Sequence, residues 1–355
     1  MDFTPDDTQG EIASLAAQVL GKADEPADQW KALADAGLLA LPLPADLGGD
    51  GLGVGHVGPV LTEVGRAAAA VPAYAVLALG ILPIEALGTP AQRAEFLPPA
   101  AAGETILTAA LHEPSAPLTS LPGTSGAAAD GAWAVTGVKT HVPYAAEAAR
   151  ILTPIALPGG TGVALVDPRA DGVEVLPAYN ATGTPEYTVR FDGARVSEAD
   201  FLRDRTAGHA VQTLHRYALA GAVALGDGLL AGALALTAQH VGERTQFGRP
   251  LATFQAVAQQ IADVYVASRT VHLAAVSAVW RLASGLDADT ELDIAAYWLT
   301  EEALSALAIC HHLHGGVGVD RTYPLHRYSS AVKDLGRAVG GAAHRLGRLG
   351  ERVAG

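Results

Sequence analysis

The sequence contains a single cysteine, Cys310, among its 355 residues. A disulfide within the chain and a metal site built from several cysteines are therefore both excluded. Cys310 falls in a helical pattern, where one isolated thiol is most simply interpreted as a small buried apolar side chain.

Aromatic residues and positive charge are also scarce. Half of the residues are hydrophobic but only 5% are aromatic, so alanine, leucine and valine must supply the buried surface, which suits close-packed helices. The 23 lysines and arginines are outnumbered by 37 acidic residues, which gives a formal net charge of −14. Binding to nucleic acid requires a basic patch for the phosphates, so the charge argues against a nucleic-acid partner and disfavours an anionic membrane.

The chain lacks a long uninterrupted apolar run and a signal-like start. Residues 67–82 are rich in alanine and are interrupted by Pro72, and the first ten residues, MDFTPDDTQG, are acidic and polar. We therefore expect no membrane span and a cytoplasmic location.

Three regions of different periodicity follow one another, which predicts an α+β fold that is mostly α. A helical domain is expected over residues 1–104, a small antiparallel β barrel or sandwich over 105–205, and a four-helix bundle over 206–355. Residues 38–55 are rich in proline and glycine, but they lack the context of a phosphate-binding motif, so they are interpreted as a structural loop.

The expected elements follow from apolar spacing and turn residues. The first region predicts helices at 11–22, 27–36, 57–66, 74–87 (with a kink at Pro83) and 90–96. The second predicts strands at 106–111, 133–136, 139–142, 150–154, 162–166, 173–176 and 188–191. The third predicts long helices at 209–243, 253–284, 290–314 and 325–353.

Residues 244–261, RTQFGRPLATFQAVAQQI, carry the most specific chemistry. Arg244 ends one predicted helix, Gly248-Arg249-Pro250 break the chain, and Thr253 is placed to cap the next helix. A helix N-terminus beside two arginines favours an anion, because its N–H groups and dipole attract phosphate and guanidinium groups bind it with two hydrogen bonds. An ordinary helix–loop–helix corner explains the same residues, and nothing local excludes it.

Four segments in the same order resemble the acyl-CoA dehydrogenase family across nearly the whole chain. They are WKALADAGLLALPLPADLGGDGLG from Trp30, LHEPSAPLTS (111–120) with WAVTGVKTHVPYAAEA (133–148), ERTQFGRPLATFQAVAQQIAD (243–263) and HLHGGVGVDRTYPLHR (312–327). The resemblance implies an N-terminal helical domain, a central β domain and a C-terminal four-helix bundle, in agreement with the periodicity.

The family holds FAD across a dimer interface, so the resemblance also implies cofactor-binding residues. One set would contact the pyrophosphate and ribose: Arg244, Gln246, Phe247 and Gln255. A second set would line the other side: His312, Leu313, Gly315 and Gly316. His312 stands where the family usually has glutamine, and its ring can still donate a hydrogen bond. The cluster of His311, His312 and His314 suggests zinc, but no carboxylate lies nearby in the sequence, so no metal is expected.

The family's catalytic base is a glutamate, and neither position that it takes in the family holds a carboxylate here. The resemblance places one position at Val339, in the segment that begins at Pro324, and the other at His215, directly before Arg216. Asp334 is about five residues from Val339, which on a helix is more than one turn away and on a different face. No catalytic residue is therefore assigned.

The segments that cradle the flavin ring in the family are altered as well. HEPSAPL (112–118) replaces Thr-Glu-Pro-x-x-Gly-Ser, and KTHVP (139–143) replaces Lys-x-Trp-Ile-Thr. Side chains that would stack on the ring or hydrogen-bond to it are lost, and Pro143 lacks even a backbone N–H. The half of the site that reaches a neighbour's cofactor is intact, whereas the half that would hold this chain's own flavin is eroded.

With this asymmetry, the chain resembles one subunit of actinobacterial heteromeric acyl-CoA dehydrogenases of the steroid side-chain type, namely the subunit that lacks the catalytic glutamate. The resemblance predicts a paralogous partner that carries the glutamate, FAD shared at the subunit interface, and an α2β2 heterotetramer. The substrate would be an acyl-CoA, with a steroid side-chain CoA as the candidate. Two alternatives stay open. A homo-oligomeric flavoenzyme of the same fold could use His215 as a base, with a flavin monooxygenase that consumes oxygen with reduced flavin as a related variant. A structural or regulatory subunit would bind no cofactor.

Overall fold

The computed structural model describes residues 3–203 and 208–354. The chain divides into two compact units. One unit comprises Met1–Gly21, Gly58–Ala69 and Ala222–Gly355, and the other comprises Lys22–Val57 and Ala70–Gly221. The predicted boundary between residues 205 and 206 lies outside the described residues, so the three-part division stays a prediction.

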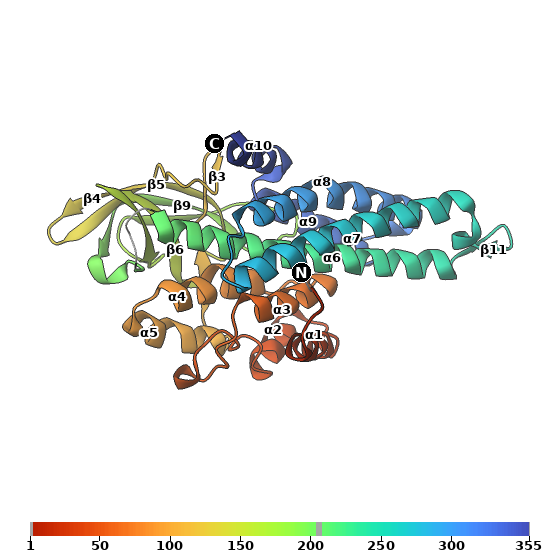
Figure 1. The fold of residues 1–355 in the computed structure, drawn as a ribbon, viewed down its shortest axis with the longest axis horizontal. Helices are drawn as coiled ribbons and strands as arrows, with labels where there is room; N and C mark the ends of the chain where they lie inside the picture. Colours follow the sequence, from red (N-terminus) through yellow and green to blue (C-terminus); the bar gives the residue numbers. More distant parts are fainter. Residues whose placement is uncertain (1–2, 204–207, 355) are drawn as a thin grey trace. The chain divides into compact units, whose positions relative to one another are not determined.

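Short helices precede the sheet, and local sequence explains where they begin (Figure 1). They are α1 (Asp7–Leu20), α2 (Pro26–Asp35), the 3-10 turn η1 (Ala45–Leu47), α3 (Val54–Arg66), the π-helix η2 (Tyr74–Ile81), α4 (Leu82–Leu87) and α5 (Pro90–Ala101). Asp6 caps α1 and Thr89 caps α5, and each forms a capping box with the glutamine three residues later. The predicted helices are present, although α1 and α3 start earlier and α5 ends later than expected.

The segment predicted as one kinked helix over 74–87 is a π-helix followed by an α-helix. Residues 75–81 of η2 are all buried, and Pro83 lies in the first turn of α4. Proline has no N–H to donate, and its ring displaces the carbonyl one turn earlier. The helix therefore accommodates Pro83 through the wider turns of the preceding π-helix, and not through the predicted kink.

The middle of the chain forms a nine-stranded sheet. Its strands are β1 (Ile106–Ala109), β2 (His112–Glu113), β3 (Ala116–Pro117), β4 (Ser125–Ala129), β5 (Ala132–Pro143), β6 (Ala148–Leu157), β7 (Gly160–Val166), β8 (Val173–Pro177) and β9 (Glu186–Ser197), followed by the 3-10 turn η3 (Glu198–Asp200). The long strands β5 and β9 pair antiparallel, β4 pairs with β5, and β6 pairs antiparallel with β7 but parallel with β1. Buried Val135, Ile151 and Phe191 contribute to its core.

Two strand predictions need correction. Residues 133–136 and 139–142 belong to one strand, β5, because Gly137 continues the strand where it passes close to Thr124. A Cβ on Gly137 would lie only 2.6 Å from the Cα of Thr124, so no other residue fits there without a shift. The sequence analysis missed β4, because its SGAAA segment has small side chains without an apolar alternation.

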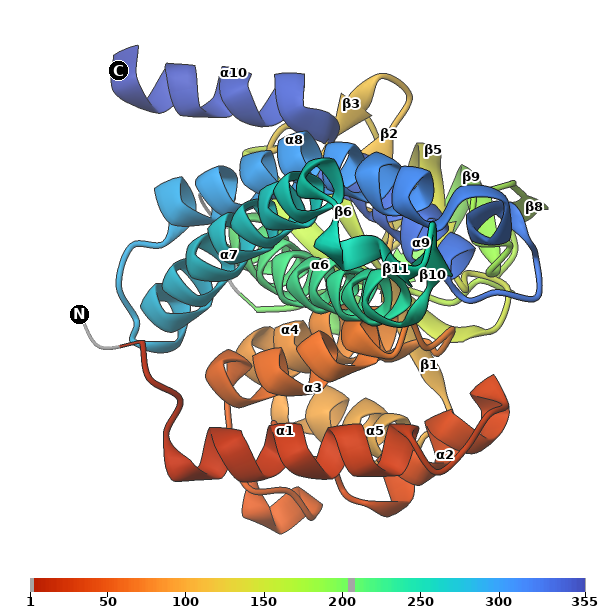
Figure 2. The ribbon, with the colours of Figure 1, turned by 90° about the vertical axis from the view of Figure 1, so that its right-hand side faces the viewer.

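Long helices make up the rest of the described chain (Figures 1 and 2). They are α6 (His209–Glu243), α7 (Gln255–Ala283), α8 (Asp289–His314), α9 (Leu325–Ala338) and α10 (Gly341–Ala354). Helices α7 and α8 pack together, and α10 lies beside α8 (Figure 2). A Cβ on Gly228 of α6 would lie 1.8 Å from the carbonyl oxygen of Thr62 in α3, so glycine is required for this close approach.

The helix predicted over 325–353 is two helices. Gly340 and Gly341 have φ values of 88° and 79°, in the left-handed region that an α-helix does not use. Helix α9 therefore stops at Ala338, and α10 starts in a new direction.

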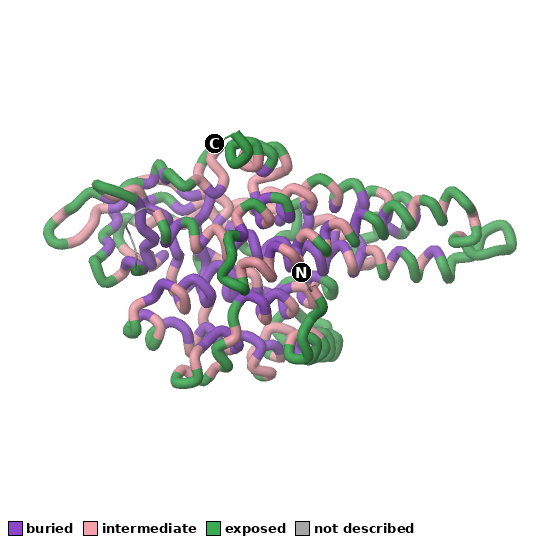
Figure 3. Tube along the Cα trace, viewed as in Figure 1, coloured by how far each residue is buried: buried purple, intermediate pink, exposed green. Residues whose placement is uncertain are grey.

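Helix α6 is the one helix in the described part of the chain that is long and apolar enough to cross a membrane. Its apolar window is 72% buried inside the protein, as the dominance of buried positions along α6 in Figure 3 shows. A core helix passes the same test of length and composition, so α6 is weak evidence for a membrane span.

Candidate cofactor-contact site

The segment after α6 forms a two-stranded hairpin at the end of the bundle. Strand β10 (Thr245–Gln246) pairs antiparallel with β11 (Arg249–Pro250). Phe247 and Gly248 form the turn and have φ values of 51° and 77°, the pattern of a type I′ hairpin turn. Every residue from Arg244 to Pro250 is exposed, and Phe247 is 92% exposed (Figure 3). The hairpin therefore presents the first predicted set of side chains to the outside of this chain.

Main-chain hydrogen bonds fix the base of the hairpin. The N–H of Arg244 donates to the His240 carbonyl at 2.9 Å, and the Arg244 carbonyl accepts from the Leu251 N–H at 2.8 Å. The Arg249 guanidinium lies 4.0 Å from the centre of the Phe254 ring, which is a cation–π contact. Because Arg249 is held against its own chain, Arg244 is the better candidate for an outside anion.

The start of α7 differs from the prediction, since Thr253 does not cap this helix. Thr253 lies in the 3-10 turn η5 (Leu251–Thr253), and its hydroxyl donates to the Pro250 carbonyl at 2.7 Å. Helix α7 begins at Gln255 after Phe254, which makes no capping hydrogen bond with its side chain. Gln255 is exposed, so an outside acceptor can reach the first-turn N–H groups that a polar cap would have occupied.

The second predicted set lies at the end of α8. His312 is exposed, and Gly315 ends the helix with φ 60° and ψ −138°, a conformation that favours glycine. The Gly315 N–H donates to the His311 and His312 carbonyls, so it is already engaged within the chain. For an outside ligand, Gly315 therefore provides space and no backbone hydrogen bond. A Cβ on Gly315 or Gly316 would meet nothing within 4 Å. Leu313 is only 8% exposed and packs in the core, so its side chain does not face an outside ligand.

A pair of histidines brings the two sets together. The rings of His240 and His314 stack with their centroids 4.4 Å apart. Arg244 follows His240 by one helical turn and Gly315 follows His314 directly, so both sets lie at the same end of the bundle. This pair was not predicted from the sequence. The only feature that could have indicated it is that each histidine lies near a helix end, shortly before a predicted contact residue. A guanidinium, two carboxamides and helix N–H groups together suit the oxygens of a pyrophosphate and a ribose.

Val339, at one of the two base positions, is a structural residue. It is 1% exposed and is the C-cap of α9, and its carbonyl accepts a hydrogen bond from the Arg345 Nε. Arg345 is itself buried and donates to Asp293 of α8 at 2.7 Å, and Arg352 donates to the same carboxylate at 2.9 Å. The junction between α9 and α10 is therefore fixed by an ion-pair network whose one carboxylate, Asp293, is bound by two arginines.

His215, at the second base position, is half-buried in α6. Asp334, the acid nearest to Val339 in the sequence, lies in α9 and pairs with Arg337 at 3.5 Å. Among the described residues, no group of three or more histidine, cysteine or acidic side chains is arranged to hold a metal ion.

The altered β segments are tied down by a buried ion pair. Glu113 accepts from the Lys139 ammonium at 2.8 Å, from the Thr124 N–H at 2.9 Å and from the Gly123 N–H at 2.7 Å. Burial alone would raise the pKa of Glu113, but the hydrogen bonds from Lys139 and Thr124 and the lysine charge lower it to about 2. Burial lowers the pKa of Lys139, against the opposing effect of Glu113. This pair joins β2 to β5 and the loop before β4.

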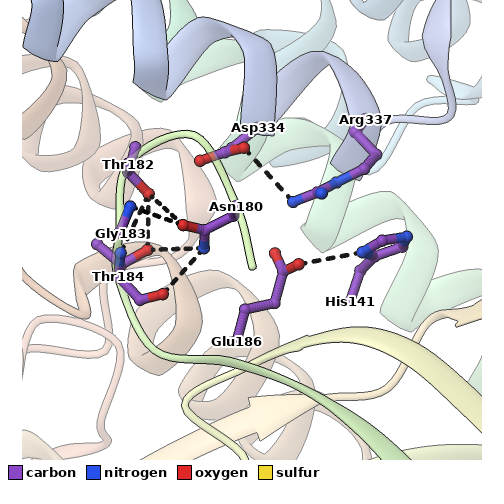
Figure 4. A network of polar contacts seen from close by, with 8 residues as sticks. All are labelled: His141, Asn180, Thr182, Gly183, Thr184, Glu186, Asp334 and Arg337. Carbon is purple, nitrogen blue, oxygen red and sulfur yellow. Dashed lines mark hydrogen bonds and ion pairs between the residues drawn. The ribbon is translucent and has the colours of Figure 1, made fainter. Parts of the chain in front are cut away.

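Next to that pair, His112 and His141 stand where the family has a threonine and a tryptophan. Each position therefore carries an imidazole in place of the family's hydroxyl or indole group. The His141 Nδ1 lies 3.0 Å from Glu186 (Figure 4), and its ring meets the His112 ring edge-on at 6.1 Å. Figure 4 also shows the neighbouring loop, in which Asn180 accepts from the Gly183 N–H at 2.7 Å. His141 has a φ of 56°, an unusual conformation for a residue other than glycine. These segments do not fit the family's flavin-ring cradle.

Comparison with known proteins gives matches over almost the whole chain. The family models for the N-terminal and C-terminal domains of acyl-CoA dehydrogenase match residues 6–104 and 210–350. The chain is 46% identical over 352 residues to the acyl-CoA dehydrogenase FadE28 of Mycobacterium tuberculosis, which covers 99% of both proteins. It is 31% identical over 379 residues to FadE27 of the same organism, covering 100% of this chain and 99% of that protein.

Solved structures give the same result. The chain is similar to one in the ChsE4-ChsE5 complex from Mycobacterium tuberculosis, with a TM-score of 0.92, 30% identity and coverage of 100% and 99%. It is also similar to a chain of the Tcur3481-Tcur3483 steroid ACAD, with a TM-score of 0.90, 32% identity and coverage of 98% and 97%. Butyryl-CoA dehydrogenase from Megasphaera elsdenii has a TM-score of 0.89 at 20% identity and full coverage of both chains, which shows the shared fold.

Proposed function

Because this chain belongs to the acyl-CoA dehydrogenase family, whose members are FAD-dependent oxidoreductases acting on CH–CH bonds, we propose that it is one subunit of a heteromeric acyl-CoA dehydrogenase. In this proposal a paralogous partner holds most of the FAD and supplies the catalytic glutamate. The observation that carries the proposal is a contrast within the chain. The outward-facing set around Arg244 is exposed and suits phosphate, whereas Val339 at the base position is buried and apolar.

Each exposed group has a role that follows from its chemistry. The Arg244 guanidinium neutralises the pyrophosphate, and backbone hydrogen bonds fix the point of the chain from which this side chain extends. The carboxamides of Gln246 and Gln255 donate to ribose or phosphate oxygens, and Gly315 and Gly316 let the backbone approach the dinucleotide closely. FAD, when bound, supplies the hydride acceptor, and the proton on the α carbon is taken by the partner's glutamate.

The substrate class and the assembly are proposed from the relatives. One similar structure is a complex of two different chains, ChsE4 and ChsE5, and another is a steroid ACAD made of Tcur3481 and Tcur3483. We therefore propose an α2β2 heterotetramer in the cytoplasm that dehydrogenates a steroid side-chain acyl-CoA.

The bundle has a surface suited to a partner subunit. Large apolar side chains are exposed on α7 and α8, which pack against each other: Tyr265, Val266, Leu273 and Leu304. Exposed apolar residues on adjacent helices are typical of protein interfaces. This surface supports an assembly of several chains.

The first experiment measures the flavin content of the purified protein. The chain is expressed alone and together with a paralogous chain that carries the glutamate, and FAD is quantified by its absorbance. We expect the chain alone to contain almost no FAD, and the complex to contain about one FAD per pair of chains and to oxidise a steroid side-chain acyl-CoA. Stoichiometric FAD and full activity in the chain alone would overturn the proposal.

A second experiment separates a cofactor-contacting subunit from a structural one. Arg244→Ala removes the phosphate contact, and we expect the co-purified complex to lose most of its FAD while it still assembles. Arg190→Ala, which removes an exposed arginine from β9 rather than from the apolar surface of α7 and α8, serves as the matched control. Unchanged FAD in the Arg244→Ala complex would favour a structural or regulatory subunit instead.

A further inference from the structure

Both ring nitrogens of His314 in the His240–His314 stack have a hydrogen-bond partner. The His314 Nδ1 lies 2.7 Å from the Cys310 carbonyl oxygen, and its Nε2 lies 3.1 Å from the Tyr323 hydroxyl. A carbonyl can only accept, so Nδ1 carries a proton, and in the neutral ring Nε2 accepts from the tyrosine. Both nitrogens of the neutral ring are therefore satisfied, and His314 is 5% exposed.

The stack connects the two segments that face the flavin in the proposed function. The His240 carbonyl accepts the Arg244 N–H at the base of the hairpin, and His314 directly precedes the glycine turn. The two rings lie nearly parallel, at an interplanar angle of 20°. A change at this contact is therefore passed to the last turn of α6 and the last turn of α8 together.

We propose that His240 and His314 are positioning residues that hold the hairpin and the glycine turn at a fixed relative position for binding the flavin. Protonation of the stacked rings weakens this contact and lets the two segments move apart. The ligand in this proposal rests on the proposed function, whereas the stack and its protonation state do not.

The charges around the stack set the direction of the effect. Burial and the Arg244 charge lower the pKa of His240 against the opposing charge of Glu243. Burial also lowers the pKa of His314, against the Cys310 hydrogen bond, and the nearby His240 and His311 lower it further. Both rings are thus neutral above the ordinary histidine value of 6.5. As the pH falls below that value, protons bind more readily to the separated rings, so the stacked arrangement becomes less stable than the separated one.

The protonation state can be read in the full chain without flavin or partner. Nitrogen-15 NMR of the histidine-labelled chain should show the His314 proton on Nδ1 at about pH 7.5, and both rings should titrate below the ordinary histidine range. A proton on Nε2 of His314, or an ordinary titration of both rings, would overturn the proposal.

The effect on the cofactor is measured as flavin release from the complex, followed by FAD fluorescence between about pH 7.5 and 5.5. We expect release to rise as the pH falls in the wild type. His240→Phe keeps a ring that can stack but removes one titrating group, so most of this rise should disappear. His240→Ala removes the ring and should weaken flavin binding about fivefold even at about pH 7.5.

His272→Gln is the matched control, because His272 pairs with Asp227 between α6 and α7 at 2.9 Å and lies outside the stack. Its release profile should equal that of the wild type. Identical profiles for the wild type and His240→Phe would reject the positioning role. A complex that never binds flavin would contradict the proposed function, and the NMR titration would still decide whether the stack behaves as inferred.

Discussion

Val339 fills a position that the family otherwise gives to a base, and its surroundings are adapted to an apolar side chain. It is buried at the end of α9, and its carbonyl is bound by Arg345, which is engaged with Asp293. A carboxylate at this position would compete with Asp293 for the same guanidinium. In this chain, the Arg345–Asp293 network therefore occupies the surroundings of the predicted base position.

Val339→Glu should consequently not create activity in the chain expressed alone. We expect a loss of about 2–4 kcal/mol in the free energy of unfolding, because a buried charge replaces an apolar group. Val339→Leu, the apolar control, should cost less than about 1.5 kcal/mol. Urea unfolding gives the stabilities, and an artificial electron acceptor reports dehydrogenation. Acyl-CoA oxidation by the Val339→Glu chain alone would show that only the base was missing.

Glu113 and Lys139 form the other residue pair whose protonation has a predictable consequence. The lowered pKa of Glu113, about 2 against an ordinary 4.5, means that its ionised form stabilises the fold. This contribution is fully present above about pH 4.5 and is lost as the pH falls toward 2.

Lys139→Met should therefore lower the free energy of unfolding by about 3–5 kcal/mol at neutral pH, since it leaves the carboxylate buried without its cation. The double variant Glu113→Gln/Lys139→Met should recover at least half of that loss. Urea unfolding at neutral and acidic pH tests both points. The stability difference between the wild type and the double variant should shrink as the pH falls through the Glu113 range, and a difference independent of pH would refute the assignment.

At the scale of the elements, the hairpin after α6 keeps a bulky residue in a conformation that disfavours it. Phe247 has a φ of 51° and is 92% exposed, and within its own chain the ring meets the Phe254 ring edge-on with centroids 6.2 Å apart. A non-glycine residue in the left-handed region costs about 1 kcal/mol, which one edge-on ring pair can offset in part or in full. Because most of the ring stays exposed, we expect it to make a contact outside this chain as well, at the place that the family resemblance gives it.

Phe247→Gly tests this explanation. The type I′ turn tolerates glycine at both central positions, so the thermal stability of the chain should stay equal or rise slightly. Flavin binding by the complex with the partner should weaken, because the ring is lost from the interface. Leu121→Gly, which removes another exposed apolar side chain from a loop before β4, is the control and should leave flavin binding unchanged. A large loss of stability in Phe247→Gly would instead show that the ring serves its own chain.

The bounds of helices and strands could be predicted from the sequence where neighbouring residues determine them. The prediction was wrong where contacts between residues far apart in the sequence determine them. Helix α6 begins and ends where its apolar pattern does, at His209 and Glu243. Strand β4 was not predicted, because its five small residues form a strand only by pairing with β5. Thr253 resembled a cap, but the chain closes a 3-10 turn first, so its hydroxyl bonds to Pro250.

The candidate site shows the same division. The exposed contact residues were identified from a local segment and a family resemblance, and the structure brings them to one end of the bundle. The His240–His314 stack joins segments far apart in the sequence, and neither histidine carries a signal of the other. The burial of Leu313 was not expected either, because the resemblance indicates a contact without stating which atoms face outward.

At the scale of the whole molecule, the fold prediction is confirmed: the chain has the helical and β parts of an acyl-CoA dehydrogenase over its full matched length. The proposed function joins this complete fold to a chain in which neither predicted base position holds a carboxylate. Under that proposal, two paralogous chains divide the work: this chain contributes the exposed groups around Arg244, and its partner contributes the glutamate.

This division makes opposite predictions for the two candidate bases. His215→Gln in this chain keeps a polar side chain in α6 and removes the only imidazole at a family base position, and the activity of the complex should stay within about twofold. Replacing the partner's glutamate by glutamine should lower kcat by at least about a hundredfold, since general-base catalysis is worth that much or more. FAD content serves as the control for assembly in both complexes, because neither change touches the dinucleotide contacts. If His215→Gln lowered turnover by at least about a hundredfold with FAD retained, the base would lie in this chain, and the pH profile of the residual activity would lack the imidazole titration of the wild type.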